Sequence, residues 1–448
     1  MNVAPRLQSD LTEIVPRLRQ TVRLAELRPL KGRVRRVLGI IVHATVADVR
    51  IGEICELRDP RSGRTLSAEV VGFLENEAVL TPIGEVTGIS METEVIPTGE
   101  ELSVPVGPDL LGRVVSPLGE PLDGVPWSST ALERRRTVHA EPPRPMERDL
   151  IEHPLQLGIR AIDGLLTVAR GQRVGIFGES GVGKSTLLAS IVRGTDADVV
   201  VLGLIGERGR EVHEFIERQL GREGRARSVA VVSTSDRPAT ERVKAAHTAT
   251  SIAEYFRDQG RHVLLLMDSV TRFARAQREI GLAAGEPPTR RGFPPSLFAA
   301  LPRLLERTGP GRGGSITALY TVLVEGDGTL DPIAEEVQAI LDGHIVLSPE
   351  LAQRNHFPAI DVLRSRSRLM ETVAAVEHRA AAARVRDLLA RYADIEILVR
   401  VGEYKTGADP KSDEALAKID QINAFLRQPF EQSAPMDATV RRLQEIAS

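Results

Sequence analysis

The stretch that most constrains the fold is 173–186, RVGIFGESGVGKST, in which a short apolar run meets a glycine-rich loop. Gly178, Gly183, Lys184 and Ser185 fill the fixed positions of the G-x-x-x-x-G-K-[ST] pattern. Such glycines let backbone N–H groups turn inward around a polyphosphate, and the helix that follows adds the positive end of its dipole. The nucleotide-binding positions that we predict are Gly178, Glu179, Ser180, Gly181, Val182, Gly183, Lys184, Ser185 and Thr186.

Two side chains of this loop carry the polar chemistry. Lys184 supplies a full positive charge to the outer phosphates, and the Ser185 hydroxyl can complete a magnesium shell. A glycine-rich turn without a ligand is the alternative. It is disfavoured because apolar residues at helical spacing, 187–192, follow the loop, so strand, loop and helix come in the required order.

The composition limits the class of protein. The chain has 448 residues and 42% hydrophobic content, enough for about two to four globular domains. Its formal charge of −3 provides no global basic field that would recruit nucleic acid or an anionic membrane. Cys55 is the only cysteine, which excludes an intrachain disulfide and fits a reducing compartment. Without an apolar signal core or membrane-length apolar run, we expect a cytoplasmic protein.

Four segments with different hydrophobic patterns divide the chain. Residues 1–30 carry apolar residues at near-helical spacing, and this helix either contacts a partner or packs on its own domain. Residues 31–97 hold short β-rich runs, typical of a small barrel. Residues 98–370 alternate apolar strands with helical patterns such as 239–258, which predicts an α/β domain with a parallel sheet covered on both faces. Residues 371–448 lack strand runs and predict a helical domain.

Within the predicted barrel, the first β-rich run covers 34–46. Barrels of this size often bind nucleic acid, but that use requires aromatic side chains on which bases stack. Phe73 is the only aromatic residue in 31–97, so a structural or assembly role is favoured.

Two carboxylates end apolar runs and are candidates for chemistry. Asp268 follows the run 264–267, where an acid beside a P-loop can hold magnesium through water. Glu207 ends another run, from which a carboxylate can orient and polarise a water for attack on the γ-phosphate. The alternative for Glu207 is a solvated charge paired with Arg208 or Arg210.

Arg364, Arg366 and Arg368 occupy alternate positions, so an extended backbone places all three on one face. An arginine donated across a subunit boundary stabilises charge on a transferring phosphoryl group. The spacing alone favours a solvated basic edge or a salt-bridge cluster instead.

The order of these motifs resembles the catalytic ATPases of bacterial type III secretion systems, which are homologous to the catalytic subunit of the rotary ATP synthase. The resemblance spans about residues 30 to 430. It rests on GESGVGKST at 178–186, LIGERGREV at 204–212, LLLMDSVTRFARAQRE at 264–279, GEPPTRRGFPPS at 285–296, VEGDGTLDPIAEEV at 324–337 and ILDGHIVLSPELAQRNHFPAIDV at 340–362. GISMETEVIPTGE at 88–100 and VRIGEIC at 49–55 are more similar to the injectisome branch than to the flagellar branch.

The resemblance implies an N-terminal β-barrel, a RecA-like nucleotide domain and a C-terminal helical domain, with ATP and Mg²⁺ at the subunit interfaces of a homohexamer. It implies that Glu207 activates water with Arg208 as its neighbour in the site, and that Asp268 is the magnesium-side acid. Arg272 is implied as a phosphate-region contact, and Arg368 as the finger that reaches into the neighbouring site. The adenine pocket is completed by the C-terminal domain, without an aromatic residue that we can assign.

One departure concerns Arg364 and Arg366, where members of this family carry small or apolar residues. Arg368 is therefore the predicted finger, although a neighbouring arginine could substitute for it. In heterohexameric relatives the catalytic carboxylate and the trans arginine are divided between two kinds of subunit. This chain has both, Glu207 and Arg368, which favours a ring of identical copies.

The function that the resemblance implies is an ATP-driven motor that releases chaperones from secreted proteins, unfolds them and delivers them to an export gate at the inner membrane. Its implied partners are central stalk and stator proteins and chaperone–substrate complexes, with 1–30 as a candidate stator contact. The alternatives are a flagellar export ATPase, an RNA translocase resembling the transcription terminator Rho, and a noncatalytic nucleotide-binding subunit. Sparse aromatics disfavour RNA binding, and Glu207 disfavours the noncatalytic alternative. The loop 285–296 either lines a pore or is an ordinary surface loop.

Overall fold

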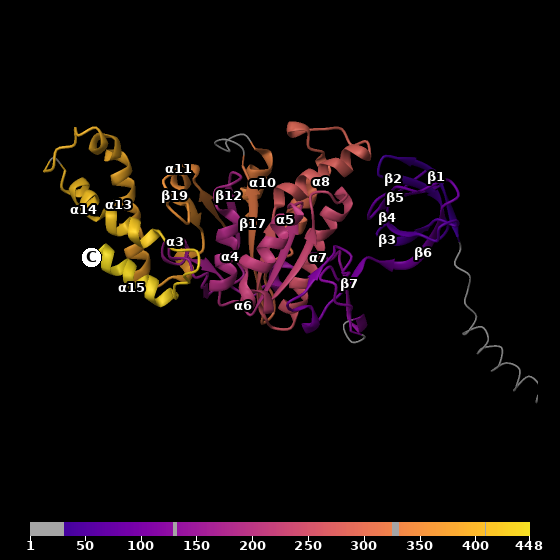
Figure 1. Cartoon of the computed structure of the whole chain (residues 1–448), viewed down its shortest axis with the longest axis horizontal. Coiled ribbons are helices and arrows are strands. Elements are labelled where there is room, and N and C mark those ends of the chain that lie inside the picture. Colours follow the sequence, from indigo (N-terminus) through magenta and orange to yellow (C-terminus); the bar gives the residue numbers. More distant parts are fainter. Residues whose placement is uncertain (1–30, 129–131, 325–330, 408) are drawn as a thin grey trace, which may run out of the picture. The chain divides into compact units, whose positions relative to one another are not determined.

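The computed structural model describes residues 31–128, 132–324, 331–407 and 409–448 (Figure 1). The predicted helix within 1–30, with its possible stator contact, lies outside these described residues. The chain divides into two compact units. One comprises the chain up to residue 82 together with 86–100, and the other comprises 83–85 and everything from residue 101 onward.

The first unit is a closed barrel with the strand order β1-β2-β5-β4-β3-β6. Its strands are β1 (Gly32–Leu38), β2 (Ile41–Thr45), β3 (Glu53–Arg58), β4 (Thr65–Leu74), β5 (Glu77–Pro82) and β6 (Glu94–Glu101). The barrel prediction is confirmed, and the β-rich run over 34–46 forms two strands, because the chain reverses between β1 and β2. Gly39 adopts φ +58 in this turn, a conformation that glycine reaches without a steric penalty.

Inward-facing side chains of the barrel form a core of their own, which includes Val34, Val42, Ala44, Cys55, Leu57, Val70, Leu80 and Val95. Cys55 is fully buried, and burial raises the pKa of its thiol to about 12. The thiol therefore behaves as a small apolar side chain.

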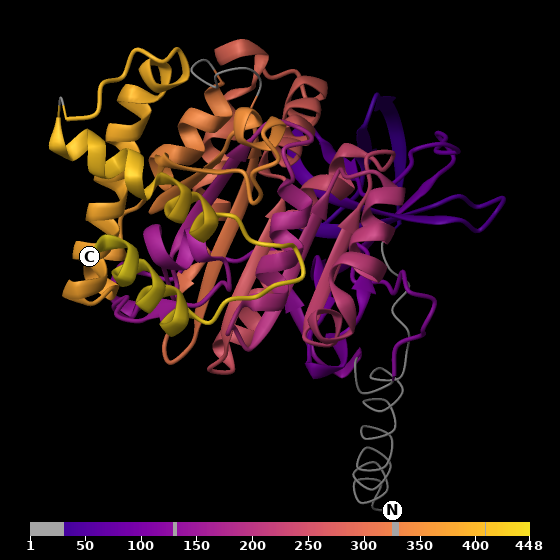
Figure 2. The same cartoon turned by 60° about the vertical axis from the view of Figure 1, so that its left-hand side comes forward.

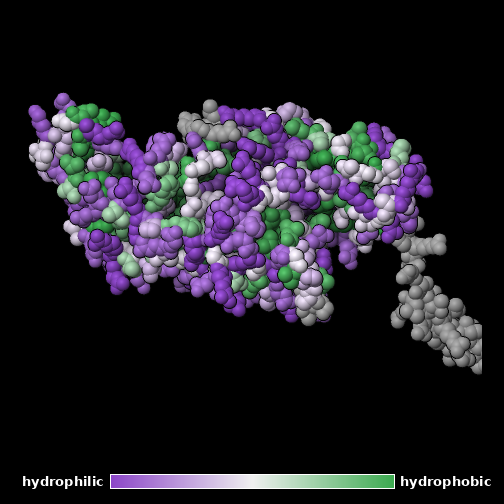
Figure 3. Space-filling view, in the orientation of Figure 1, coloured by the Kyte–Doolittle hydropathy of each residue, from purple (hydrophilic) through white to green (hydrophobic). Residues whose placement is uncertain are grey.

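On the molecular face drawn in Figure 3, hydrophilic side chains predominate and apolar ones form small separate patches.

The second unit contains, within the described residues, a nine-stranded sheet of order β19-β18-β12-β17-β15-β13-β14-β8, with β16 paired to β17. The strands are β8 (Val114–Val115), β12 (Arg173–Gly178), β13 (Val199–Ile205), β14 (Ser228–Ser233), β15 (His262–Asp268), β16 (Gly309–Pro310), β17 (Ser315–Leu323), β18 (Gly343–Leu347) and β19 (Ile360–Ser367). All pairings are parallel except those of β16 and β19, which are antiparallel. The predicted parallel sheet is confirmed, with an antiparallel edge strand that the apolar pattern did not indicate.

Helices cover both faces of this sheet (Figures 1 and 2). The helices of this part of the chain are α3 (Arg160–Leu165), α4 (Lys184–Gly194), α5 (Gly209–Glu214), α6 (Gly221–Ala226), α7 (Ala239–Asp258), α8 (Val270–Ala283), α9 (Pro295–Leu305), α10 (Pro332–Ile340) and α11 (Pro349–Gln353). Leu202 of β13 shares a core with Leu187 and Leu188 of α4. The next residue, Gly203, faces the opposite side, where a Cβ atom would lie 3.2 Å from Ala249 of α7. The alternation of side chains along a strand therefore places α4 and α7 on opposite faces.

The predicted helix 239–258 coincides with α7, and a π-helical turn at Phe215–Gln219 lies between α5 and α6. Shorter elements connect these parts. They are β7 (Ser103–Pro105) paired with β9 (Arg135–Thr137), β10 (Pro154–Leu155) paired with β11 (Val168–Ala169), and 3₁₀ turns at Pro108–Leu110, Pro145–Glu147 and Arg290–Gly292.

The C-terminal part is helical, as predicted, with α12 (Met370–Val373), α13 (Val376–Arg400), α14 (Pro410–Leu426) and α15 (Met436–Ala447). Its apolar side chains, such as Leu388, Phe425 and Leu443, belong to the same core as those of α3 and α4. Figure 2 shows these helices in yellow beside the sheet domain. No helix among the described residues combines the length and apolarity that a membrane crossing requires.

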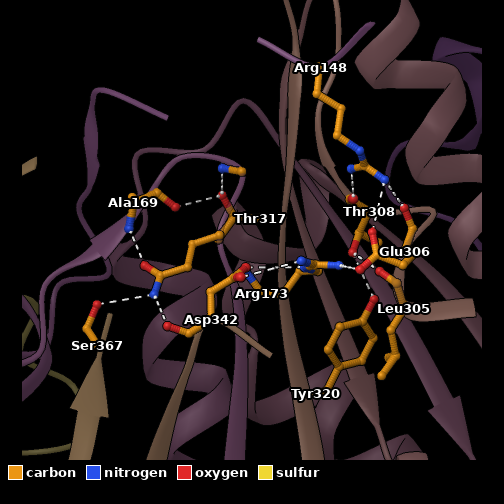
Figure 4. Close-up of polar contacts among 12 residues, drawn as sticks. Arg148, Ala169, Arg173, Leu305, Glu306, Thr308, Thr317, Tyr320, Asp342 and Ser367 are labelled. Carbon is orange, nitrogen blue, oxygen red and sulfur yellow. Dashed lines mark hydrogen bonds and ion pairs between the residues drawn. The ribbon is translucent and has the colours of Figure 1, made fainter. Parts of the chain in front are cut away.

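A polar network fixes the sheet where its parallel strands begin (Figure 4). Arg173, the first residue of β12, donates from its backbone N to Asp342 Oδ2 at 3.1 Å, and its guanidinium pairs with Asp342 and Glu306. Gln172 Nε2 donates to Ser367 Oγ at 3.1 Å, which attaches the end of the antiparallel edge strand β19 to the same place. Because Arg368 directly follows Ser367, this contact also holds the backbone of Arg368 at the start of the parallel strands.

Candidate active site

The P-loop follows β12 and leads into α4, as the sequence predicts. Gly181 and Gly183 both adopt φ +87, which residues with a side chain rarely reach. Lys184, the first residue of α4, is 9% exposed, whereas Ser185 and Thr186 are exposed. The loop therefore presents hydroxyl groups to solvent while the lysine points into the domain.

Lys184, at the start of α4, lies close to Asp268, which ends β15 two strands away from β12 in the sheet. Its Nζ lies 3.7 Å from Asp268 Oδ1, and Asp268 is 5% exposed at the end of β15. Thr321 of β17, the strand between β12 and β15, donates from its Oγ1 to the same carboxylate oxygen at 2.6 Å. Parallel strands thus place a cation, a hydroxyl and a carboxylate at one edge of the sheet, as expected for α/β sheets of this kind.

Glu207 follows β13, on the far side of β15, and it pairs with Arg272 in the first turn of α8. Arg272 Nε lies 2.9 Å from Glu207 Oε1, and Arg272 Nη2 donates to Oε2 at 3.3 Å. The alternative pairing with Arg208 or Arg210 is not observed. Arg208 is exposed and lies 3.3 Å from Glu211, and Arg210 pairs with Glu214 at 3.1 Å.

The electrostatic surroundings of Glu207 suit a proton acceptor. Burial raises the pKa of Glu207 above its usual value, and the negative charge of Asp268 raises it further, while Arg272 and Lys184 act in the opposite direction. A general base works best when its pKa approaches the working pH. The pKa of Glu207 is therefore shifted in the direction that this role needs.

The predicted arginine face is present but lies apart from this cluster. Arg364, Arg366 and Arg368 are all exposed, while the intervening Ser365 is buried. None of the three forms an ion pair with another described residue, so the predicted alternative of a salt-bridge cluster is not observed there. Ser367 pairs with Gly343, which is level with Val174 near the start of β12. Arg368 therefore lies about 15 Å along the sheet from the P-loop of its own chain.

An aromatic residue that the sequence did not assign lies against the P-loop. A Cβ atom built on Gly183 would lie 3.4 Å from Cε1 of Phe357, so the ring lies beside the loop, at a distance that an added methyl group would fill. Phe357 precedes β19 and is 42% exposed. The sequence shows only that Phe357 is an aromatic residue in the loop before an edge strand. This pattern does not indicate that its ring lies beside the P-loop.

The fit of a metal ion can be tested on the same residues. The described part of the chain contains no group of three or more His, Cys, Asp or Glu side chains arranged to hold a metal. Ser185 and Asp268 alone offer too few ligands, but magnesium usually takes one or two protein ligands and completes its shell with water and phosphate. These residues therefore fit a magnesium ion that arrives with a nucleotide.

Three protein-family profiles match consecutive parts of the chain. The ATP synthase alpha/beta family β-barrel domain matches residues 34–99, the nucleotide-binding domain of that family matches 158–367, and the T3SS EscN ATPase C-terminal domain matches 374–445. Together they cover the barrel, the sheet domain and the C-terminal helices.

Curated relatives match over nearly the whole chain. The type 3 secretion system ATPase of Sinorhizobium fredii is 56% identical over 440 residues, which is 98% of this chain and 97% of the relative. The type 3 secretion system ATPase of Xanthomonas euvesicatoria is 57% identical over 416 residues, 93% of each chain. The flagellum-specific ATP synthase of Bacillus subtilis is 49% identical over 415 residues, 92% of this chain and 94% of the relative.

A solved structure of the assembled ATPase EscN from the type III secretion system of enteropathogenic Escherichia coli has the same fold. It superimposes with a TM-score of 0.87 at 48% identity and covers 93% of this chain and 100% of the EscN chain. A second structure, of EscN in complex with its central stalk EscO, gives a TM-score of 0.85 at the same identity, with the same coverage of both chains.

Proposed function

The chain belongs to the type III secretion system ATPases, and from this premise we propose that it is a homohexameric, Mg²⁺-dependent motor for protein export. The proposal includes a cytoplasmic location at the inner-membrane face of the apparatus and association with chaperone–substrate complexes, a stator and a central stalk. Support for a stalk partner comes from EscN, whose complex with the stalk EscO is described above. ATP is the nucleotide that we assign to the P-loop.

The convergence of Lys184, Asp268, Glu207 and Arg272 at one edge of the sheet carries this proposal. Lys184 holds the outer phosphates, while Ser185 and Asp268 hold the magnesium ion, directly or through water. When bound, magnesium supplies positive charge that offsets the charge of the phosphate oxygens. Glu207 orients a water and accepts its proton, and Arg272 keeps the Glu207 carboxylate in place beside the phosphates.

Arg208 and Phe357 complete the proposed nucleotide site. Arg208 is exposed next to Glu207 and pairs at the surface with Glu211, so a bound phosphate or a neighbouring subunit can compete for its guanidinium. We assign Phe357 to stack on the adenine base, because its ring lies beside the P-loop and part of it is exposed.

Arg368 is assigned to the site of a neighbouring copy. Its distance from its own P-loop argues against a role within the same chain, and its exposure without an ion-pair partner among the described residues leaves the guanidinium available to another chain. Because the same chain also carries Glu207, a ring of identical copies contains a complete site at every interface.

Steady-state ATP hydrolysis, measured as a function of protein concentration, tests this function. We expect activity per chain to rise with concentration, and Glu207→Gln and Arg368→Ala to abolish it while each variant still binds ATP. A flat concentration dependence, or a harmless Arg368→Ala, would contradict shared sites and direct attention to Arg364 and Arg366.

A flagellar export role is the second candidate, and the 49% identity to the flagellum-specific ATP synthase of Bacillus subtilis supports it. The higher identities to type 3 secretion system ATPases favour the injectisome branch. Restoration of secretion in a strain that lacks either its injectisome ATPase or its flagellar ATPase separates these two roles. A salt-dependent affinity for single-stranded RNA would instead favour a Rho-like translocase.

A further inference from the structure

Gln428 is a buried amide in the segment 427–435 that connects α14 to α15, and it is 5% exposed. Its Oε1 accepts a hydrogen bond from the backbone N of Arg160 at 2.9 Å. Its Nε2 donates to the carbonyl oxygens of Gly158 at 2.7 Å and Gln432 at 2.6 Å. Both amide donors are therefore used, and the side chain fixes this connection against the loop before α3.

The backbone of Gln428 reaches a different part of the domain. Its N–H donates to the carbonyl oxygen of Phe357 at 2.9 Å. The ring of Phe357 lies beside Gly183 of the P-loop and is partly exposed, so its own packing does not enclose it. The hydrogen bond from Gln428 therefore restrains the main chain from which the ring projects.

The connection is also attached to the back of the P-loop helix α4. Ser190 Oγ donates to the carbonyl oxygen of Phe430 at 3.0 Å, and the guanidinium of Arg193 lies 4.0 Å from the centre of the Phe430 ring. Gly158, which accepts from Gln428, approaches α4 so closely that a Cβ on it would lie 2.6 Å from Gly194 Cα. Gln428 thus joins the P-loop helix and the Phe357 loop into one framework.

We propose that Gln428 is a positioning residue for the nucleobase: its side-chain amide holds the segment 427–435 in place, the backbone N–H of that segment holds the main chain of Phe357, and the residue so sets the affinity for the base without touching the nucleotide. The inference rests on the proposed stacking role of Phe357. The triphosphate is held by the P-loop and Lys184, which Gln428 does not contact. The residue therefore affects recognition of the base and leaves recognition of the phosphates unchanged.

The test compares binding of ATP with binding of inorganic tripolyphosphate, which carries the phosphates and lacks the base. Gln428→Leu removes all three side-chain hydrogen bonds, and Gln428→Glu removes the two donors with little change in shape. We expect both variants to bind ATP about tenfold more weakly, within the range of one base–aromatic stack. We expect tripolyphosphate affinity and kcat at saturating ATP to stay within about twofold of the original values. Gln421→Leu, at an exposed position of α14, is the matched control.

A double-variant cycle with Phe357→Ala distinguishes the steps of the argument. If Gln428 acts through Phe357, Phe357→Ala with Gln428→Leu weakens ATP binding no more than Phe357→Ala alone. Additive losses, or an equal loss of tripolyphosphate binding, would overturn the proposal, because Gln428 would then support the domain in general. If Phe357→Ala weakens ATP binding and Gln428→Leu does not, only the role of Gln428 fails. If Phe357→Ala leaves ATP binding unchanged, the stacking role and this proposal both fail, whereas the ATPase assignment is unaffected.

Discussion

Two regions of the second unit carry positively charged side chains in different surroundings. One is the edge of the sheet where Lys184 and Arg272 meet Asp268 and Glu207, called the phosphate edge. The other is the row of exposed arginines at the end of β19, called the arginine face. At the phosphate edge, Lys184 and Arg272 are partly or fully buried, and each lies within ion-pair distance of a carboxylate. Arg364 and Arg366 of β19, and Arg368 directly after this strand, are exposed and form no ion pair with another described residue. The cations of the phosphate edge are therefore paired within one chain, whereas the arginines of the arginine face have no such partners among the described residues and can pair with a group of another molecule.

This difference separates what a single copy can do from what requires a second one. A buried cation without a counter-charge is costly, so the pairs at the phosphate edge must form as the chain folds. Exposed arginines remain hydrated and pay no desolvation free energy, so they can stay unpaired until an anionic group of another chain or a ligand binds. The comparison therefore supports the proposal that one chain binds the phosphates and that an arginine at an interface stabilises the transferring phosphoryl group.

Subunit mixing tests this division most strongly. Arg368→Ala should lower kcat by about 10³- to 10⁵-fold, the usual range for an arginine finger. Mixed with Glu207→Gln, it should regain activity, because some interfaces then combine an intact Glu207 with an intact Arg368. The measurement is ATP hydrolysis of the mixture against each variant alone. No recovery in rings shown to contain both variants would place both residues in one chain's site.

Glu207→Gln tests the buried region. The change keeps the shape of the side chain and removes the proton acceptor, so we expect kcat to fall by about 10²- to 10⁴-fold with ATP affinity retained. Single-turnover hydrolysis and fluorescent-nucleotide binding measure the two effects. Glu217→Gln, on an exposed carboxylate ten residues away, is the control. Equal losses in both variants would argue against a specific role for Glu207.

A buried ion pair outside the site tests how much such pairing contributes to the free energy of unfolding. Arg307 and Glu254 are each 2% exposed at the side chain, and Arg307 Nη2 lies 2.8 Å from Glu254 Oε2. Glu254→Gln should lower the free energy of unfolding by about 3–5 kcal/mol, because a charged guanidinium remains buried. Urea unfolding measures this, and hydrolysis per folded chain should change little. A loss below about 1 kcal/mol would show that the site hydrates readily.

The pH dependence tests the pairing of Glu207 with Arg272. Arg272 lowers the pKa of Glu207, so Arg272→Gln should raise it. A general base loses activity as the pH falls through its pKa, and the acid limb of the kcat profile should therefore move to higher pH. Arg275→Gln, one turn further along α8, is the control. A limb that stays in place would mean that another group titrates there.

The smallest effect is expected at the exposed face. Arg366→Ala should change the free energy of unfolding by less than about 0.5 kcal/mol, because its side chain has no ion-pair partner among the described residues. Urea unfolding of the monomeric chain at low protein concentration measures this. A loss comparable to that of Glu254→Gln would show that the arginine face is organised within one chain, and the comparison would fail.

Much of the site could be read from local patterns. The P-loop has a fixed spacing, and its φ values at Gly181 and Gly183 follow from the motif. Asp268 and Glu207 were identified because each ends an apolar run, and parallel strands end at a common edge. The antiparallel direction of β19 and the turn between β1 and β2 were not predicted, because apolar content reports burial and does not specify strand direction or every reversal of the chain.

The sequence by itself determined the nucleotide loop, the parallel sheet with its helices, the barrel, and the two strand-end carboxylates. Each of these depends on residues close together in the chain, where spacing fixes geometry. Only the tertiary structure decided that Arg272 pairs with Glu207, that Phe357 lies on the P-loop beside the connection held by Gln428, and that Arg368 lies far from its own phosphate site. These contacts join segments separated by tens to hundreds of residues, and no local periodicity encodes which side chains meet across such distances.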